Sequence, residues 1–376
     1  MVTDKIKKVM AFAREAGGVA AIGPVCQAIL KVGWELLLLS KDHGLDVFKR
    51  YNLDCVDFPV FDKHKLSLLV NEKFKSLPDL IFNSATSLPK LDMTERYLWE
   101  WGQKHNIPTI GVVDQWQNYA VRFSGVGEKD RLAYLPDYIF IMDDFAKNEM
   151  ISNGLPENRL VVTGNPTFDR LRKTYKTFEL QVDEIKKRIN ITTDYMVFTF
   201  VAESLRKDFG TIIGYDEHAT LRTLGNILDQ LNSKADGLQI FLIIKLHPEN
   251  QLKEFDWVYN EWPLLAKKII KDELIPYEVI AISDVLVGIS SVMLLEALLV
   301  DRIVVSLQIN SSIESQMVAT KSGAIPFIET EEVARMTIEN LFQSKEYRKD
   351  YLKKQRGWKV KGNATKKCID FMRSLN

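Results

Sequence analysis

The segment of residues 285–297, VLVGISSVMLLEA, decides the fold. Its first part, Val285 to Gly288, is a short apolar run of the kind that forms a buried parallel strand. Two serines follow and open an apolar helix that we expect over Ser291 to Leu299. A strand that passes through a short polar turn into a helix is the repeating unit of α/β proteins. The segment therefore predicts a parallel sheet with a ligand site at the carboxyl ends of its strands.

The same segment predicts chemistry. A helix start carries unpaired N–H groups and the positive end of the helix dipole, and the hydroxyls of Ser290 and Ser291 would add donors for a phosphate. Glu296 lies further along the apolar helix, where a buried carboxylate needs partners such as the hydroxyls of a ribose. The alternative is a serine that only caps the helix and a glutamate that faces water. The position directly after a buried strand favours the binding site.

Working outward, short apolar runs alternate with amphipathic stretches along the whole chain. In the first half we predict six strands, at Val9–Ala13, Trp34–Ser40, Leu80–Ser84, Thr109–Val113, Tyr138–Met142 and Leu160–Thr163. In the second half we predict five, at Tyr195–Val201, Gln239–Lys245, Lys268–Lys271, Val285–Gly288 and Ile303–Leu307. Predicted helices lie between them, one ending at Leu30 and one over Glu217–Leu231. Each half therefore reads as one Rossmann-like unit.

A chain of 376 residues exceeds one ordinary core, so two domains are expected. The stretch from Lys173 to Asp194 is polar and charged, and we place the boundary at its start. The predicted organisation is a first Rossmann-like domain over 1–172, a second Rossmann-like domain over 173–350, and a C-terminal helix over 351–376 that packs back on the first domain. The motifs and the resemblance given below imply that the first domain binds an acceptor and the second a nucleotide.

The composition is that of a globular protein, with 46% hydrophobic and 27% charged residues. Fifty basic residues balance fifty acidic ones, so the chain has no net positive charge that would attract nucleic acid. The three cysteines, Cys26, Cys55 and Cys368, lack metal-type spacing and suit a reducing compartment. Neither a signal peptide nor an apolar run of about 20 residues is recognisable. We therefore expect a cytoplasmic protein; the sequence does not indicate an oligomeric state.

The last residues are basic, at Lys353, Lys354, Arg356, Lys359, Lys361, Lys366 and Lys367. We interpret them as a solvent-facing helical surface. The alternative is a contact with the inner face of a membrane that carries lipid-linked acceptors.

Further candidates follow the other strands of the second domain. Lys245-Leu246-His247-Pro248 comes directly after an apolar run, and Pro248 ends the strand there. His247 can donate to a phosphate or a base carbonyl, and Lys245 can supply positive charge. A histidine that only caps a strand end is an equal alternative. Arg206 follows the first strand of this domain and could pair with a diphosphate, although a solvated loop explains it nearly as well.

In the first domain, Gly17 and Gly18 follow the first strand and permit close approach of a ligand. Their loop lacks the G-x-G-x-x-G pattern, which disfavours an NAD enzyme. Asp114 follows another strand among aromatic residues and could act as a general base on a sugar hydroxyl; a helix-capping role is about as favourable. Glu15, in the early loop, is the second candidate base. Asn165 lies in a Gly-Asn-Pro turn and is expected to be structural.

With these motifs in order, the chain resembles the GT-B superfamily of nucleotide-sugar glycosyltransferases and non-hydrolysing UDP-N-acetylglucosamine 2-epimerases. The segment from Thr163 to Asp169 looks like the turn that joins the two halves of the epimerases. The segment from Ser290 to Glu296 is similar to the family's nucleotide site, where the serine meets phosphate and the glutamate meets ribose. The Lys-x-His-Pro element is similar to that of transferases that bind cytidine nucleotides. The resemblance implies two Rossmann-like domains facing across a cleft.

Two departures separate the chain from the epimerases. Their His-Arg-Glu-Asn sequence is replaced by the stretch from Ala202 to Arg206, which has no histidine, and their Gly-Thr-Arg-Pro-Glu is replaced by the stretch from Ala13 to Ala16. We therefore predict a glycosyltransferase that uses a UDP- or CMP-linked sugar in surface glycan or polysaccharide biosynthesis, without metal or cofactor. Its partners would be the nucleotide-sugar donor and a glycan or lipid-linked acceptor. A 2-epimerase and a non-catalytic nucleotide-binding protein are the alternatives.

Overall fold

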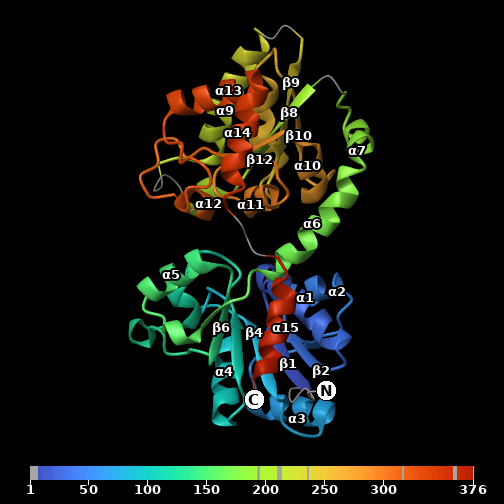
Figure 1. Cartoon of the computed structure of the whole chain (residues 1–376), viewed down its shortest axis with the longest axis vertical. Coiled ribbons are helices and arrows are strands. Elements are labelled where there is room, and N and C mark those ends of the chain that lie inside the picture. Colours follow the sequence, from blue (N-terminus) through green and yellow to red (C-terminus); the bar gives the residue numbers. More distant parts are fainter. Residues whose placement is uncertain are drawn as a thin grey trace. The chain divides into compact units, whose positions relative to one another are not determined.

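A computed structural model describes residues 7–192, 195–209, 214–234, 237–315, 317–358 and 362–375 (Figure 1). The chain forms two compact units, each with its own parallel sheet. The first unit comprises residues 1–170 and 360–376, and the second comprises residues 171–359. The two units are described one at a time.

The first unit holds a seven-stranded parallel sheet in the order β3-β2-β1-β4-β5-β6-β7. Its strands are β1 (Lys8–Ala13), β2 (Glu35–Ser40), β3 (Val56–Asp57), β4 (Leu80–Ser84), β5 (Thr109–Val112), β6 (Tyr138–Ile141) and β7 (Leu160–Val162). The helices are α1 (Ala16–Lys31), α2 (His43–Lys49), α3 (Lys63–Phe74), α4 (Thr94–Lys104), α5 (Asp144–Ser152) and α15 (Ala364–Ser374). Helix α6 (Pro166–Glu179) leads out of this unit, and short 3₁₀ turns lie at Ala120–Phe123, Glu128–Asp130 and Glu157–Arg159.

The second unit holds a five-stranded parallel sheet in the order β10-β9-β8-β11-β12. Its strands are β8 (Tyr195–Val201), β9 (Gln239–Lys245), β10 (Ala266–Ile270), β11 (Val285–Gly288) and β12 (Ile303–Ser306). Its helices are α7 (Val182–Arg188), α8 (Leu205–Phe209), α9 (Glu217–Asn232), α10 (Pro276–Ile282), α11 (Val292–Leu299), α12 (Val318–Lys321), α13 (Glu331–Gln343) and α14 (Lys345–Gln355). A 3₁₀ segment spans Leu252–Tyr259.

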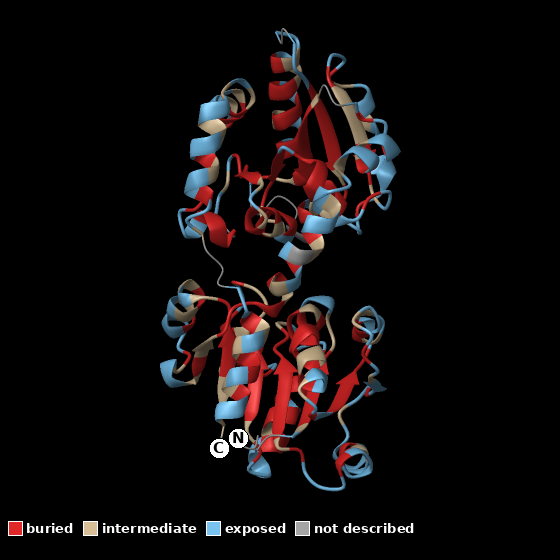
Figure 2. Ribbon diagram, turned by 45° about the vertical axis from the view of Figure 1, so that its right-hand side comes forward, coloured by how far each residue is buried: buried red, intermediate tan, exposed pale blue. Residues whose placement is uncertain are grey.

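Both sheets are buried on both faces, which explains why their strands read as almost continuous apolar runs (Figure 2). In the first unit, α1 turns Val19, Ile22 and Ile29 toward the sheet at helical spacing. In the second unit, α9 does the same with Leu221, Leu224 and Leu228. The strand–helix alternation expected from the sequence is confirmed.

The strand predictions differ from the structure mainly at the edges of the sheets. The predictions for β4, β8, β9 and β11 are confirmed residue for residue. The run predicted at 268–271 begins earlier, as β10 (Ala266–Ile270), and β3 was not predicted. Both are edge strands, where one side lacks a pairing partner and the apolar pattern weakens.

The order of strands places a topological switch point in each sheet, between β1 and β4 and between β8 and β11. Consecutive crossovers leave in opposite directions on the two sides of such a point, so the loops after these strands diverge and leave room for a ligand. The loops after β8 and β11 contain Glu203 and Ser290. The candidate site of the second unit therefore lies where open α/β sheets bind their ligands.

The predicted C-terminal helix over 351–376 is two helices in the structure. Helix α14 belongs to the second unit and α15 to the first, where it packs against α1 and inserts Phe371 beside Tyr138 and Phe140 (Figure 1). The basic residues are divided accordingly: Lys353, Lys354 and Arg356 are exposed at the end of α14, and Lys366 and Lys367 lie on α15. Lys359 and Lys361 lie outside the described residues. In the described part of the chain, no helix is long and apolar enough to span a membrane.

The start of α15 depends on a carboxylate from another helix. Its own N-cap, Asn363, makes no side-chain cap, and Asp169 of α6 accepts instead from the N–H groups of Ala364 (3.0 Å) and Thr365 (2.6 Å). Asp169→Ala should therefore destabilise α15 by about 1 kcal/mol, which accelerates hydrogen exchange of amides 364–374 about fivefold. Asp370→Ala, which removes an exposed carboxylate from the same helix, is the control. Equal protection in the two variants would contradict the capping role.

Candidate functional site

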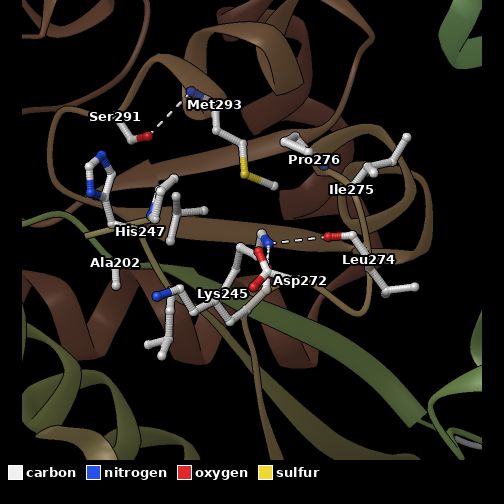
Figure 3. Close-up of a pocket in the computed structure, with 13 residues that line it drawn as sticks. Ala202, Lys245, His247, Asp272, Leu274, Ile275, Pro276, Ser291 and Met293 are labelled. Carbon is white, nitrogen blue, oxygen red and sulfur yellow. Dashed lines mark hydrogen bonds between the residues drawn. The ribbon is translucent and has the colours of Figure 1, made fainter. Parts of the chain in front are cut away.

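A pocket of about 310 Å³ opens at the carboxyl ends of β8, β9 and β10 in the second unit (Figure 3). Its apolar wall includes Leu274, Pro276 and Met293, and its polar edge includes His247 and Ser291. A concave apolar site with a few fixed polar groups is the usual form of a small-molecule site.

His247 is held by its own loop and keeps one ring nitrogen for a ligand. Its backbone N–H donates to Asn250 Oδ1 (3.0 Å), and its Nδ1 accepts from the backbone N–H of Glu249 (3.3 Å). Because Nδ1 is an acceptor, the proton of the neutral imidazole is on Nε2. The ring lines the pocket, so Nε2–H is a directed donor there (Figure 3).

Lys245 differs from its expected role as a free positive charge. Its ammonium donates to the carbonyl oxygens of Lys271 and Leu274, the latter at 3.1 Å (Figure 3). Partial burial lowers the pKa of this amine. Lys245 therefore fixes the loop between β10 and α10, which forms one side of the pocket.

Asn250 connects the loops of the pocket and was not among the predicted residues. Besides accepting from the His247 N–H, it donates from Nδ2 to the Glu203 carbonyl (3.3 Å), and its own carbonyl accepts from Lys271 Nζ (2.8 Å). The residue is almost fully buried. The only sequence signal was its place two residues after Pro248, where an asparagine favours a turn.

The two serines at the start of α11 are both engaged. Ser290 donates to the Glu203 carboxylate from its backbone N–H and its hydroxyl, each at 2.8 Å. Ser291 is the N-cap, and its Oγ accepts from the Met293 N–H (3.3 Å). The capping alternative is therefore realised for Ser291, while Ser290 contacts a carboxylate of the protein at the place where a phosphate was predicted.

Glu296 is the half-buried carboxylate of α11, on the same helix face as Met293 of the pocket wall. Burial raises its pKa to about 7. Among the described residues, none forms a hydrogen bond or ion pair with it. A buried carboxylate without a protein partner is costly, which is consistent with a group kept for a ligand.

Arg206 does not face the pocket as a free cation. Its guanidinium forms two hydrogen bonds with Asp216 Oδ2, from Nε (2.9 Å) and Nη2 (2.7 Å). Asp216 is also the N-cap of α9, where it accepts from the Ala219 N–H. The predicted pairing with a diphosphate would have to displace this ion pair.

In the first unit, the structure brings the two candidate bases to the start of α1. Glu15 is the N-cap residue, and Asp114 Oδ2 would lie 2.5 Å from a Cβ on Gly17. The other oxygen of Asp114 forms a 2.8 Å ion pair with Arg122, whose side chain is only 4% exposed. The ion pair with Arg122 fixes the orientation of the Asp114 carboxylate beside the start of α1.

The two glycines make room for side chains of their own unit. A Cβ on Gly17 would collide with Asp114, and one on Gly18 would lie 2.8 Å from Ser84 Oγ. This differs from the predicted approach of a ligand to these positions. Asn165 has the structural role expected for it, because its Nδ2 donates to the carbonyl of Asp114 (3.2 Å).

Sequence reasoning also missed a buried acid behind Ser84. Ser84 Oγ donates to Glu95 Oε1 (2.8 Å), and burial raises the pKa of Glu95 to about 8. Glu95 is fully buried and supports the carboxyl end of β4 without reaching the surface. Among the described residues, no cluster of histidine, cysteine, aspartate or glutamate has an arrangement that could hold a metal ion.

Comparisons with known proteins give a fold and no family. No protein-family model matches the chain, and no curated protein matches its sequence. Solved structures do match over nearly the whole chain. A Neisseria meningitidis UDP-GlcNAc 2-epimerase bound to UDP-GlcNAc is 16% identical, with 97% of this chain and 99% of that chain covered and a TM-score of 0.66.

Two further structures broaden the likeness. Anabaena HepE, in complex with UDP and glucose, is 10% identical, covers 98% of this chain and 100% of its own, and has a TM-score of 0.62. A Rickettsia africae glycosyltransferase is 11% identical, with 98% of each chain covered and a TM-score of 0.64. The predicted GT-B fold, and the resemblance to both groups in fold, are confirmed.

The buried Glu296 makes a prediction about stability. The folded-state pKa of Glu296, about 7, exceeds the ordinary 4.5. The protonated carboxyl therefore costs little stability at low pH, and the free energy of unfolding falls as the pH rises from about 4.5 to 7. Glu296→Gln should therefore raise the free energy of unfolding at pH 8 by about 2–4 kcal/mol and change it little at pH 4. Thermal melting against pH measures the difference. The exposed Glu332→Gln is the control, and equal pH profiles for the two variants would contradict the burial argument.

Proposed function

We propose that the protein is a glycosyltransferase that uses a nucleotide-activated sugar, UDP- or CMP-linked, in the synthesis of a surface glycan or polysaccharide. The observation that carries this proposal is the pocket of the second unit, which lies at the carboxyl ends of the strands beside α11. Glu296 of α11 has no hydrogen-bond partner among the residues that the structure describes. The likeness in fold to enzymes solved with UDP-GlcNAc and with UDP and glucose supports it.

The second unit would bind the donor. The apolar wall beside Leu274 and Pro276 suits a planar base, and Glu296 would accept hydrogen bonds from the ribose. His247 Nε2–H would donate to the departing phosphate, and protonation of the ring would strengthen that bond. Lys245 would hold the loop that borders the base through its bonds to Lys271 and Leu274.

The first unit would bind the acceptor, a glycan or a lipid-linked sugar. Its reacting hydroxyl needs a base, and Asp114 and Glu15 are the two carboxylates at the start of α1. Arg122 keeps Asp114 oriented through the 2.8 Å ion pair. The chemistry requires neither a metal ion nor a cofactor, because His247 and the start of α11 would neutralise the leaving phosphate.

A 2-epimerase is the second candidate, favoured by the structural likeness to the Neisseria epimerase. Epimerisation removes and returns a proton at carbon 2 of the sugar, so it needs acid–base groups beside that atom. The stretch after β8, from Ala202 to Arg206, contains no histidine, and Arg206 is paired with Asp216. These departures favour transfer.

The first test separates the two reactions. The protein is incubated with a panel of UDP- and CMP-sugars, including UDP-N-acetylhexosamine, in deuterated water. We expect release of the nucleotide without deuterium at carbon 2, and a loss of about 100-fold in His247→Ala because a charge-stabilising donor is removed. His64→Ala, a variant at an exposed histidine of α3, is the control. Normal turnover by His247→Ala, or deuterium at carbon 2, would refute transfer by this site.

A further inference from the structure

The start of α11 is already occupied by a carboxylate of the protein, that of Glu203. Both of its oxygens accept from Ser290, Oε2 from the N–H and Oε1 from the hydroxyl, at 2.8 Å each. The nearby backbone N–H groups of Ile289 and Ser291 also act to lower the pKa of this carboxyl. A carboxylate from the loop after β8 thus occupies the N-terminus of α11, which is a position that favours anions.

This arrangement uses most of the donors that a phosphate needs. Besides the Ser290 donors, the Met293 N–H is taken by Ser291 Oγ and the Leu294 N–H by the Ser291 carbonyl. A phosphate that approaches α11 therefore meets acceptors and a second negative charge. In a buried site, two anions at hydrogen-bond distance repel each other strongly, and a carboxyl in that position takes up a proton.

Within the described part of the chain, no cation forms an ion pair with Glu203. Arg206, three residues further along, is turned to Asp216, and Lys207 pairs with Glu249. The titratable groups around it are Tyr215, whose raised pKa comes from burial first and then from the charge of Glu203, and His247 on the neighbouring loop. Burial raises the pKa of Glu203 itself against the opposing hydrogen bonds from the loop.

We propose that binding of a nucleotide phosphate at the start of α11 is coupled to uptake of one proton by Glu203. In the free protein the Ser290 hydroxyl donates to the ionised Glu203. Once protonated, the carboxyl O–H donates to Ser290 Oγ, and the hydroxyl proton of Ser290 turns to the phosphate oxygen. The hydrogen bond between Glu203 and Ser290 Oγ is kept with its direction reversed, and one hydrogen bond to the phosphate is added. The proton neutralises the carboxylate, so the ligand's negative charge takes its place at the start of α11. Glu203 is thus a positioning residue that acts through Ser290.

This inference rests on the proposed function, because it assumes that a phosphate binds at α11. It makes the affinity depend on pH with a defined sign. Above the pKa of Glu203, affinity should fall about tenfold for each unit of pH, because each binding event takes up one proton. Glu203→Gln keeps the size of the side chain and an acceptor for Ser290 but carries no charge. Its affinity should be independent of pH and at least equal to that of the wild type at pH 8.5.

Calorimetric titration with UDP and, separately, with pyrophosphate tests the coupling. At pH 8 the terminal phosphate of UDP is fully ionised, whereas pyrophosphate keeps about one proton, so the protons counted with each ligand are compared between the wild type and Glu203→Gln. Titrations in buffers of different ionisation enthalpy should give close to one proton taken up by the wild type and by Glu332→Gln, and close to none by Glu203→Gln.

Each outcome separates the two proposals. Proton uptake with both ligands supports both, and uptake with pyrophosphate but no binding of UDP, or of CMP in a parallel titration, leaves the coupling standing and refutes the nucleotide function. Binding of UDP with equal proton numbers in the wild type and Glu203→Gln refutes the coupling and leaves the function standing. Thermal melting shows whether Glu203→Gln is folded. If the folded variant no longer binds either ligand, the coupling is refuted, because Glu203 would then only hold the loop after β8 in place. Absence of binding of either ligand to the wild type refutes both.

Discussion

Parallel pairing is the constraint on which this molecule depends. A parallel strand cannot return through a tight turn, so every strand of both sheets leaves through a loop at one edge and returns through a crossover, usually a helix. The carboxyl ends of all strands in a sheet therefore lie at the same edge. In the second unit the strand order reverses between β8 and β11, so the loops after these two strands diverge and leave space for a ligand. Polar residues that follow these strands, among them Glu203, His247 and Ser290, therefore lie at the same edge of the sheet.

Polar groups at such an edge are half buried, and each has to be satisfied by the loops themselves. The second unit does this with a small network: Asn250 joins the loops after β8, β9 and β10, and the pair of Glu203 and Ser290 joins β8 to β11. The network makes the pocket rigid before any ligand arrives, which lowers the cost of binding. Glu296, which has no partner among the described residues, is the exception, and this is why the proposed function assigns it to a ligand.

The sequence was sufficient for the strands and for the edge at which the candidate site lies, because apolar runs and the residues that follow them are local features. It placed β8, β9 and β11 at their true bounds and pointed to Ser291, His247 and Glu296. The sequence did not predict which side chains pair with one another. Lys245 and Arg206 read as free cations, but one is bound by carbonyls and the other by Asp216, and Glu203 was not singled out. Such pairings join residues far apart in the chain, and a periodicity argument contains no information about them.

The way the cations are used also decides how a phosphate can be held in the second unit. Two basic side chains were predicted to bind the phosphate. The Lys245 ammonium is bonded to loop carbonyls and the Arg206 guanidinium is paired with Asp216, so neither charge points into the pocket. The charge of a diphosphate would then be met by neutral donors: the His247 Nε2–H, the Ser290 hydroxyl and the dipole of α11. Neutral donors in a pre-organised pocket stabilise an anion without the desolvation cost of a buried ammonium or guanidinium. Because such donors neutralise less charge than a cation would, a second anion in the same place is poorly tolerated. In the proposed coupling, the protonation state of Glu203 therefore decides whether the site accepts a phosphate.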